Sequence, residues 1–176
     1  MINTGIAGSL NADINIGDIV VSTDLIHHDM NAVAFGYPVG QIPQMEAFSF
    51  HSDDALRALA VKACKEANPD IEVFEGRIAS GDQFVADQGV KDFITKEFGA
   101  YAVEMEGAAI AQAAYLNNVP FLVIRAISDK ADGSAEMDYP TFEARAGRAQ
   151  FQLTLRILKT FRLKRTLERF CIECYR

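Results

Sequence analysis

Short apolar runs along the chain alternate with stretches in which apolar residues recur at helical spacing. The runs are bounded by polar or turn residues, as strands are, and they cover residues 19–21, 73–78, 102–103 and 121–124. Between these runs, Asp53 and Asp87 can each cap a helix, and residues 107–116 form an alanine-rich helical stretch. After the last run, a further helix is expected over about residues 141–160. This alternation predicts an α/β fold with a mixed, largely parallel sheet flanked by helices on both faces. In such folds ligands bind at the carboxyl ends of the strands.

Two segments do not fit a complete fold of this kind. Residues 2–5 read as the last residues of a strand that runs straight into a glycine turn, so we expect further strands to precede them. Residues 24–51 form a long connection with little periodicity and many aromatic and histidine side chains. Long connections inside compact domains are usually functional or form interfaces.

Composition and charge narrow the class of protein. The 176 residues are 49% hydrophobic and 23% charged, which is typical of one globular domain with a substantial core. No apolar run approaches the roughly 20 residues of a membrane-spanning helix, so we expect a cytoplasmic protein with no membrane partner. The net charge of −7 argues against a nucleic acid as partner. We assign the domain to residues 1–160 and a basic C-terminal tail to residues 161–176.

The C-terminal region has two further features. Residues 159–176 carry six basic and two acidic side chains, a pattern that a solvated helix end explains better than a binding patch. Cys171 and Cys174 have the spacing of a metal or redox pair, but no second pair or nearby histidine accompanies them. Three cysteines are also too few for a disulfide framework. We therefore expect no metal site.

Two carboxylates lie where a short strand gives way to a helix. In an extended segment Glu104 and Glu106 share a face, and their neighbours are apolar. Two acids so close are costly to bury without partners. An ionised carboxylate can accept two hydrogen bonds at once, which suits the adjacent hydroxyls of a ribose. The alternative is a helix N-terminus stabilised by acidic residues.

Two other strand ends carry groups of chemical interest. Arg125 and Asp129 stand at the end of the most apolar strand, where they can form an ion pair that fixes a loop. Alternatively, Asp129 can protonate a leaving group if a dry pocket raises its affinity for a proton. After a third strand, Gly81 permits a tight turn and Phe84 offers a flat apolar face. A lone aromatic residue there is usually part of the core, but three strand ends with such groups favour a functional site.

Eight motifs occur along residues 2–160, at residues 3–8, 17–22, 28–29, 34–37, 40–43, 80–84, 103–106 and 125–129. In their order and spacing they resemble the bacterial 5′-methylthioadenosine/S-adenosylhomocysteine nucleosidase family of the nucleoside phosphorylase superfamily. It implies hydrolysis of a small-molecule nucleoside to adenine and a 5-thioribose, with no metal or organic cofactor. It also implies a homodimer in which the loop of residues 27–37 helps to close the partner's site.

The resemblance implies roles for four residues around the purine base. Asp129 corresponds to the general acid that protonates purine N7, so that adenine leaves as a neutral base, and Ser128 helps to orient it. Phe84 corresponds to the ring stacked on adenine. The main chain of Val85 corresponds to the group that reads the adenine edge.

At the sugar, the resemblance implies four further roles. Glu106 corresponds to the carboxylate that binds the ribose hydroxyls, and Met105 to the thioether packed on the sugar. Gly8 corresponds to the glycine that lets the backbone approach the ligand, and Arg125 to the guanidinium near the attacking water. Ile6 stands where the family commonly has serine near this water.

The family pattern also includes an N-terminal segment, with a glutamate that acts as base for the water, to which no residue here corresponds. We therefore expect this chain alone to be marginally stable and nearly inactive. Two alternatives to the nucleosidase stay open. One is a phosphate-dependent purine nucleoside phosphorylase, and the other is a catalytically inactive nucleoside-binding fragment. The preference between methylthioadenosine and adenosylhomocysteine is not readable from the residues.

Overall fold

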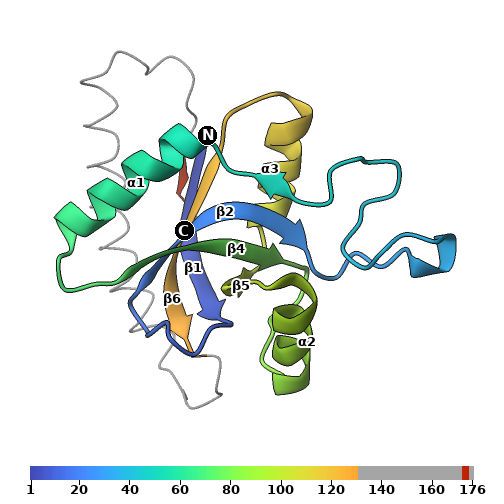
Figure 1. The fold of residues 1–176 in the computed structure, drawn as a ribbon, viewed down its shortest axis with the longest axis horizontal. Helices are drawn as coiled ribbons and strands as arrows, with labels where there is room; N and C mark the ends of the chain where they lie inside the picture. The colour runs from blue at the N-terminus through green and yellow to red at the C-terminus, as the bar shows by residue number, and fades with distance from the viewer. Residues whose placement is uncertain (131–171, 175–176) are drawn as a thin grey trace.

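A computed structural model of the chain describes residues 1–130 and 172–174 (Figure 1). The fold is α/β, as the pattern predicts. The elements, in chain order, are β1 (Ile2–Ser9), β2 (Ile19–His27), the 3₁₀ helix η1 (Val33–Phe35), β3 (Phe50–His51), α1 (Asp54–Ala67), β4 (Val73–Ser80), α2 (Gln88–Phe98), β5 (Ala102–Glu104), α3 (Gly107–Leu116), β6 (Leu122–Asp129) and β7 (Ile172–Cys174). The expected helix at 141–160, Cys171 and nearly all of the basic tail lie outside the described residues.

The strands form one mixed sheet in the order β3-β2-β4-β5-β1-β6, with β7 beside β1. The β1–β6, β2–β4 and β4–β5 pairs are parallel, whereas the β1–β5 and β2–β3 pairs are antiparallel. The terminal strand β6 also pairs with β2, where residues 19–21 face residues 124–126 in antiparallel register. The sheet therefore curls until its path closes, which the apolar pattern did not predict.

The helix caps are those expected from the sequence. The side chain of Asp53 accepts a hydrogen bond from the Leu56 N–H at 2.8 Å, and that of Asp87 accepts one from the Val90 N–H at 3.0 Å. Each bond satisfies one of the free N–H groups at the helix start, which is why aspartate is favoured there. Gly99 ends α2 in the left-handed conformation, with φ of 63°.

Each helix buries one face against the sheet (Figure 1). Helix α1 packs its buried residues on β2 and β6, and α2 packs on the second half of β2, on β4 and on β5. The inward face of α3 consists of small side chains, Ala108, Ala111 and Ala114, which let it lie close to the largest apolar cluster. Burial of this apolar surface is the main force that holds the layers together.

The expectation for residues 2–5 is wrong. They do not end a strand at a glycine turn, because β1 runs for eight residues through both Gly5 and Gly8. Instead, Gly5 and Gly8 have no side chain at positions where side chains from β6 approach the backbone of β1 closely. A Cβ at Gly5 would lie 3.1 Å from Arg125 Nη1, and one at Gly8 would lie 2.8 Å from Asp129 Oδ2.

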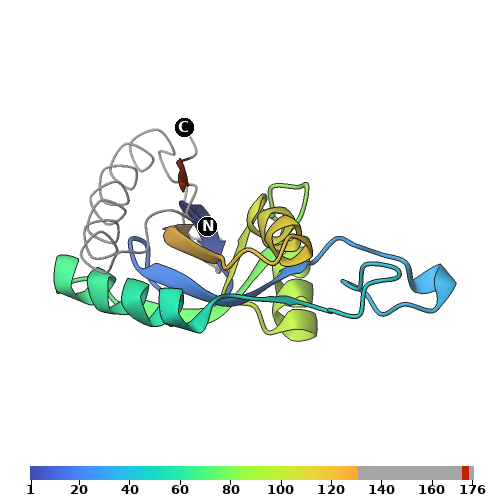
Figure 2. The same cartoon turned by 90° about the horizontal axis from the view of Figure 1, so that it is seen from above.

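The long connection is shorter than residues 24–51. Residues 24–27 complete β2, and Phe50–His51 form β3. The connection between these strands extends away from the rest of the chain in both views (Figures 1 and 2). Phe35 at its tip is 83% exposed, and Val33 is also exposed. In the described part of the chain, no helix has the length and apolarity that crossing a lipid bilayer requires.

Candidate active site

Strand pairing brings the ends of β5 and β6 together on either side of β1. Gly8 pairs with Val103 of β5 on one side and with Asp129, the last residue of β6, on the other. The register between β1 and β6 shifts between Ala7 and Gly8, an irregularity of the kind that often re-aims a side chain near a functional site. The sheet therefore places the Asp129 carboxyl group directly over the backbone of Gly8.

The Asp129 carboxyl group is held by its neighbours. The Ser128 hydroxyl lies 2.7 Å from Asp129 Oδ1 and 3.2 Å from the Ala7 carbonyl oxygen. Since a hydroxyl has one proton, it donates to Asp129 when that group is ionised. It can donate to Ala7 and accept from Asp129 when the carboxyl group is protonated. Ser128 can therefore form a hydrogen bond with Asp129 in both protonation states of that carboxyl group.

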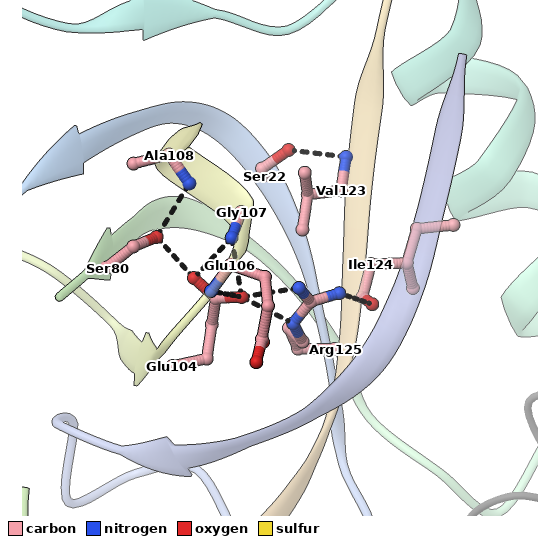
Figure 3. Close-up of polar contacts among 9 residues, drawn as sticks. All are labelled: Ser22, Ser80, Glu104, Glu106, Gly107, Ala108, Val123, Ile124 and Arg125. Carbon is pink, nitrogen blue, oxygen red and sulfur yellow. Dashed lines mark hydrogen bonds and ion pairs between the residues drawn. The ribbon is translucent and has the colours of Figure 1, made fainter. Parts of the chain in front are cut away.

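A buried ion pair occupies the other part of the site (Figure 3). Arg125, in the middle of β6, is 1% exposed and binds Glu104, the last residue of β5, through Nε at 3.1 Å and through Nη2. Glu104 also accepts hydrogen bonds from the Ser80 hydroxyl and from the Gly107 N–H at 2.9 Å. These partners satisfy a carboxylate that would otherwise be costly to bury.

The pairing of Arg125 differs from the ion pair considered from sequence. Arg125 binds Glu104, and Asp129 faces Lys91 instead, with Lys91 Nζ at 3.7 Å from Asp129 Oδ2. The sequence singled out Glu104 only as one of two neighbouring carboxylates and gave it no role of its own, and it did not identify Lys91. A carboxylate inside an apolar strand was a usable signal for Glu104, whereas the place of Lys91 depends on how α2 packs.

Glu104 and Glu106 have opposite pKa shifts. Desolvation alone would raise the pKa of Glu104, but the Arg125 charge and the hydrogen bonds from Ser80, Arg125 and Gly107 outweigh it and lower that pKa. For Glu106, desolvation and then the negative charge of Glu104 raise the pKa, and Arg125 opposes them only in part. Glu104 is therefore a fixed negative charge, while Glu106 beside it takes up a proton more readily than an ordinary glutamate.

The remaining predicted residues lie in the segments after β4 and β5. Phe84 is 73% exposed, so it is not the core residue that a lone aromatic there usually is. Met105 is 43% exposed, whereas Val85 is buried. Apolar side chains of this size can line a ligand site. Of the residues predicted from the sequence, Gly8, Ser128 and Asp129 lie in contact with one another.

Comparisons with known proteins agree with this architecture. Residues 1–159 match the family model described as the phosphorylase superfamily. The chain is 40% identical over 188 residues to the 5′-methylthioadenosine/S-adenosylhomocysteine nucleosidase of Treponema pallidum, covering 94% of this chain and 70% of that protein. The chain belongs to this nucleosidase family.

Solved structures of the nucleosidase family have the same fold. The Campylobacter jejuni nucleosidase superposes with a TM-score of 0.84 at 36% identity, covering 90% of this chain and 68% of that one. A futalosine hydrolase of Helicobacter pylori superposes with a TM-score of 0.82 at 38% identity, covering 90% of this chain and 67% of that one. The nucleoside phosphorylase-like fold expected from the sequence is thereby confirmed.

Proposed function

We propose that the protein hydrolyses the N-glycosidic bond of 5′-methylthioadenosine and S-adenosylhomocysteine and releases adenine and a 5-thioribose. These 176 residues alone should do so slowly, because none of them corresponds to the family's base for the water. The observation that carries the proposal is the placement of Asp129 at the end of β6. Its carboxyl group lies over Gly8, where the backbone leaves room, and it has a hydroxyl partner suited to both of its protonation states. The relatives named as nucleosidases support the same reaction.

The proposed reaction places negative charge on the leaving base and positive charge on the ribose. The site has a group to stabilise each of these charges. As the bond breaks, its electron pair goes to adenine N9, and N7 takes the proton of Asp129, so the base leaves neutral. The ribose then carries positive oxocarbenium character at C1′, which the carboxylate of Glu106 stabilises. Water adds its oxygen to C1′ and releases a proton to the solvent, from which Asp129 takes up a proton again. Phe84 and Met105 supply apolar contacts to base and sugar.

An adenine-release assay with and without inorganic phosphate tests the proposal and separates the alternatives. Release that does not depend on phosphate supports the nucleosidase. Release that requires phosphate would identify a phosphorylase, and binding of adenine without release would identify a binding module. Release of the purine base from methylthioadenosine, adenosylhomocysteine and futalosine should be compared, with adenine measured for the first two and hypoxanthine for futalosine, since structural relatives include both a nucleosidase and a futalosine hydrolase.

We expect Glu106→Gln to lower kcat/KM by about 10- to 100-fold, because a hydrogen bond to a charged group contributes about 1.5 to 3 kcal/mol. The amide keeps an acceptor but loses the charge that stabilises the oxocarbenium ion. Because the pKa of Glu106 is raised, the ionised form that binds ribose is lost as pH falls through a value above the ordinary 4.5.

Steady-state kinetics from pH 4.5 to 8 check this expectation, with the exposed Glu97→Gln as the matched control. The acid loss of kcat/KM should be present in the native protein and in Glu97→Gln but not in Glu106→Gln. If 2′-deoxy analogues bind the native protein as tightly as ribosides, Glu106 does not bind the hydroxyls.

We further propose that the protein is a homodimer in which the β2–β3 connection meets the partner's site. Exposed Val33 and Phe35 support this, because aromatic side chains are enriched in the centres of interfaces. Sedimentation at micromolar concentration should give a dimer, and Phe35→Asp should shift it towards monomer. A monomer with full activity would contradict the proposal. The cytoplasmic location also stays a prediction.

A further inference from the structure

Lys91 is buried on the face of α2 that packs against the sheet. It is 4% exposed and follows the same helical stripe as the buried residues Ile94 and Phe98. An apolar side chain is expected at such a position, because a buried ammonium group loses its hydration and is costly without partners. Phe93 on the same helix is 46% exposed, although it is apolar. A charge where the helix pattern calls for an apolar residue is often a sign of function.

The partners of the Lys91 ammonium group lie at the end of β6. Nζ donates a hydrogen bond to the Lys130 carbonyl oxygen at 3.1 Å and lies 3.7 Å from Asp129 Oδ2. Among the residues the structure describes, Asp129 is the carboxylate within ion-pair distance of Lys91. The Asp129 carboxyl group is therefore enclosed by three groups: the Ser128 hydroxyl at Oδ1, the Lys91 ammonium near Oδ2, and the backbone of Gly8 beneath it.

We propose that Lys91 is a positioning residue for proton transfer to the leaving base. This inference rests on the proposed role of Asp129 as general acid. When Asp129 gives its proton to purine N7, a carboxylate forms in a partly buried place, where its side chain is 25% exposed. The Lys91 ammonium stabilises this carboxylate as it forms, and the bond to Lys130 fixes the ammonium in position. Lys91 also prevents Asp129 from turning away from the base.

This role requires the positive charge of the Lys91 side chain and not only its volume. An ion pair that is only structural can often be replaced by apolar residues of similar volume at little cost. Methionine is the closest apolar match to lysine in length, so Lys91→Met separates packing from charge. The exposed Lys96 on the same helix gives the matched control, Lys96→Met.

The kinetic test measures adenine release by Lys91→Met and Lys96→Met. We expect Lys91→Met to lower kcat about 10- to 100-fold, the range for a small misplacement of a catalytic group, with KM changed less than about threefold. Lys96→Met should match the native protein. In an Asp129→Asn background, Lys91→Met should have almost no further effect on kcat, because Lys91 acts through Asp129. An equal loss of kcat in both backgrounds, or a normal kcat in Lys91→Met, would overturn the proposal.

Chemical rescue distinguishes the charge from the shape. In Lys91→Ala, added n-propylammonium replaces the missing methylenes and the ammonium group, while n-propanol replaces a similar volume without charge. We expect the ammonium compound to raise kcat and the alcohol to leave it unchanged, with thermal unfolding confirming that the variant is folded. Equal rescue by both compounds would show a packing role and overturn the proposal.

A binding test covers the case in which no turnover is seen. In 9-deazaadenine the N7 position carries a proton that donates to Asp129, whereas 7-deazaadenine has carbon there. Calorimetry should show that Lys91→Met reduces the preference for 9-deazaadenine about fivefold or more, while Lys96→Met keeps it. An unchanged preference would refute the role of Lys91. If the native protein released no adenine, the proposed function would be refuted. The binding preference between 9-deazaadenine and 7-deazaadenine would then still test whether Lys91 positions Asp129.

Discussion

Asp129→Asn is expected to lower kcat for adenine release by about 10² to 10⁴, the range for loss of a general acid. The amide has nearly the same shape and can still contact Ser128 and purine N7, so substrate affinity should change far less than kcat. Single-turnover and steady-state kinetics with methylthioadenosine measure the two quantities separately.

The exposed Asp70→Asn is a suitable control, since it makes the same chemical change away from the site. A substrate whose base leaves readily without protonation should be less affected by Asp129→Asn. If the variant releases adenine at a near-native rate, Asp129 is not the general acid, and another group protonates purine N7.

Glu104→Gln is expected to lower the free energy of unfolding by about 3 to 5 kcal/mol, because it leaves the Arg125 charge buried and unpaired. Urea unfolding followed by circular dichroism measures this loss. The control is Glu75→Gln, which breaks a more exposed ion pair with Arg57 and should cost no more than about 1 kcal/mol. Equal effects of the two substitutions would mean that the Glu104–Arg125 pair is no more important than a surface pair.

The same pair predicts how stability depends on pH. The folded pKa of Glu104 lies below its ordinary value of 4.5, so the stabilisation is complete above the unfolded pKa and is lost as pH falls through the lower folded value. The native protein should therefore lose stability in acid more steeply than Glu104→Gln does. Unfolding curves from pH 7 down to pH 3 provide the comparison.

Sequence reasoning worked where structure is local. The caps at Asp53 and Asp87, the strands and the alanine-rich helix follow from periodicity and from side-chain preferences over a few residues. Gly5 of β1 was misread because a glycine turn and a glycine that makes room for a neighbouring strand look the same in one sequence. Only the register of β1 with β6 distinguishes them.

The site was predictable in part for the same reason. Asp129 and Glu106 stand in recognisable motifs at element ends. The partner of Arg125 and the burial of Lys91 depend on contacts between segments far apart in the chain. Closure of the sheet between β2 and β6 is another long-range event, and local hydrophobic patterns carry no information about it.

The pairing of β1 has a consequence for how the chain folds. In the described part of the chain, β1 pairs with β5, β6 and β7. The pairing of Ile2 with Leu122 can therefore form only after Leu122 has been synthesised. Contacts so distant in sequence slow folding, since a long loop must close first. On the ribosome β1 therefore emerges with open hydrogen-bonding groups, a state prone to aggregation and to chaperone binding. Pulse-labelling hydrogen exchange should find the amides of β1 protected late, in the same phase as those of β6.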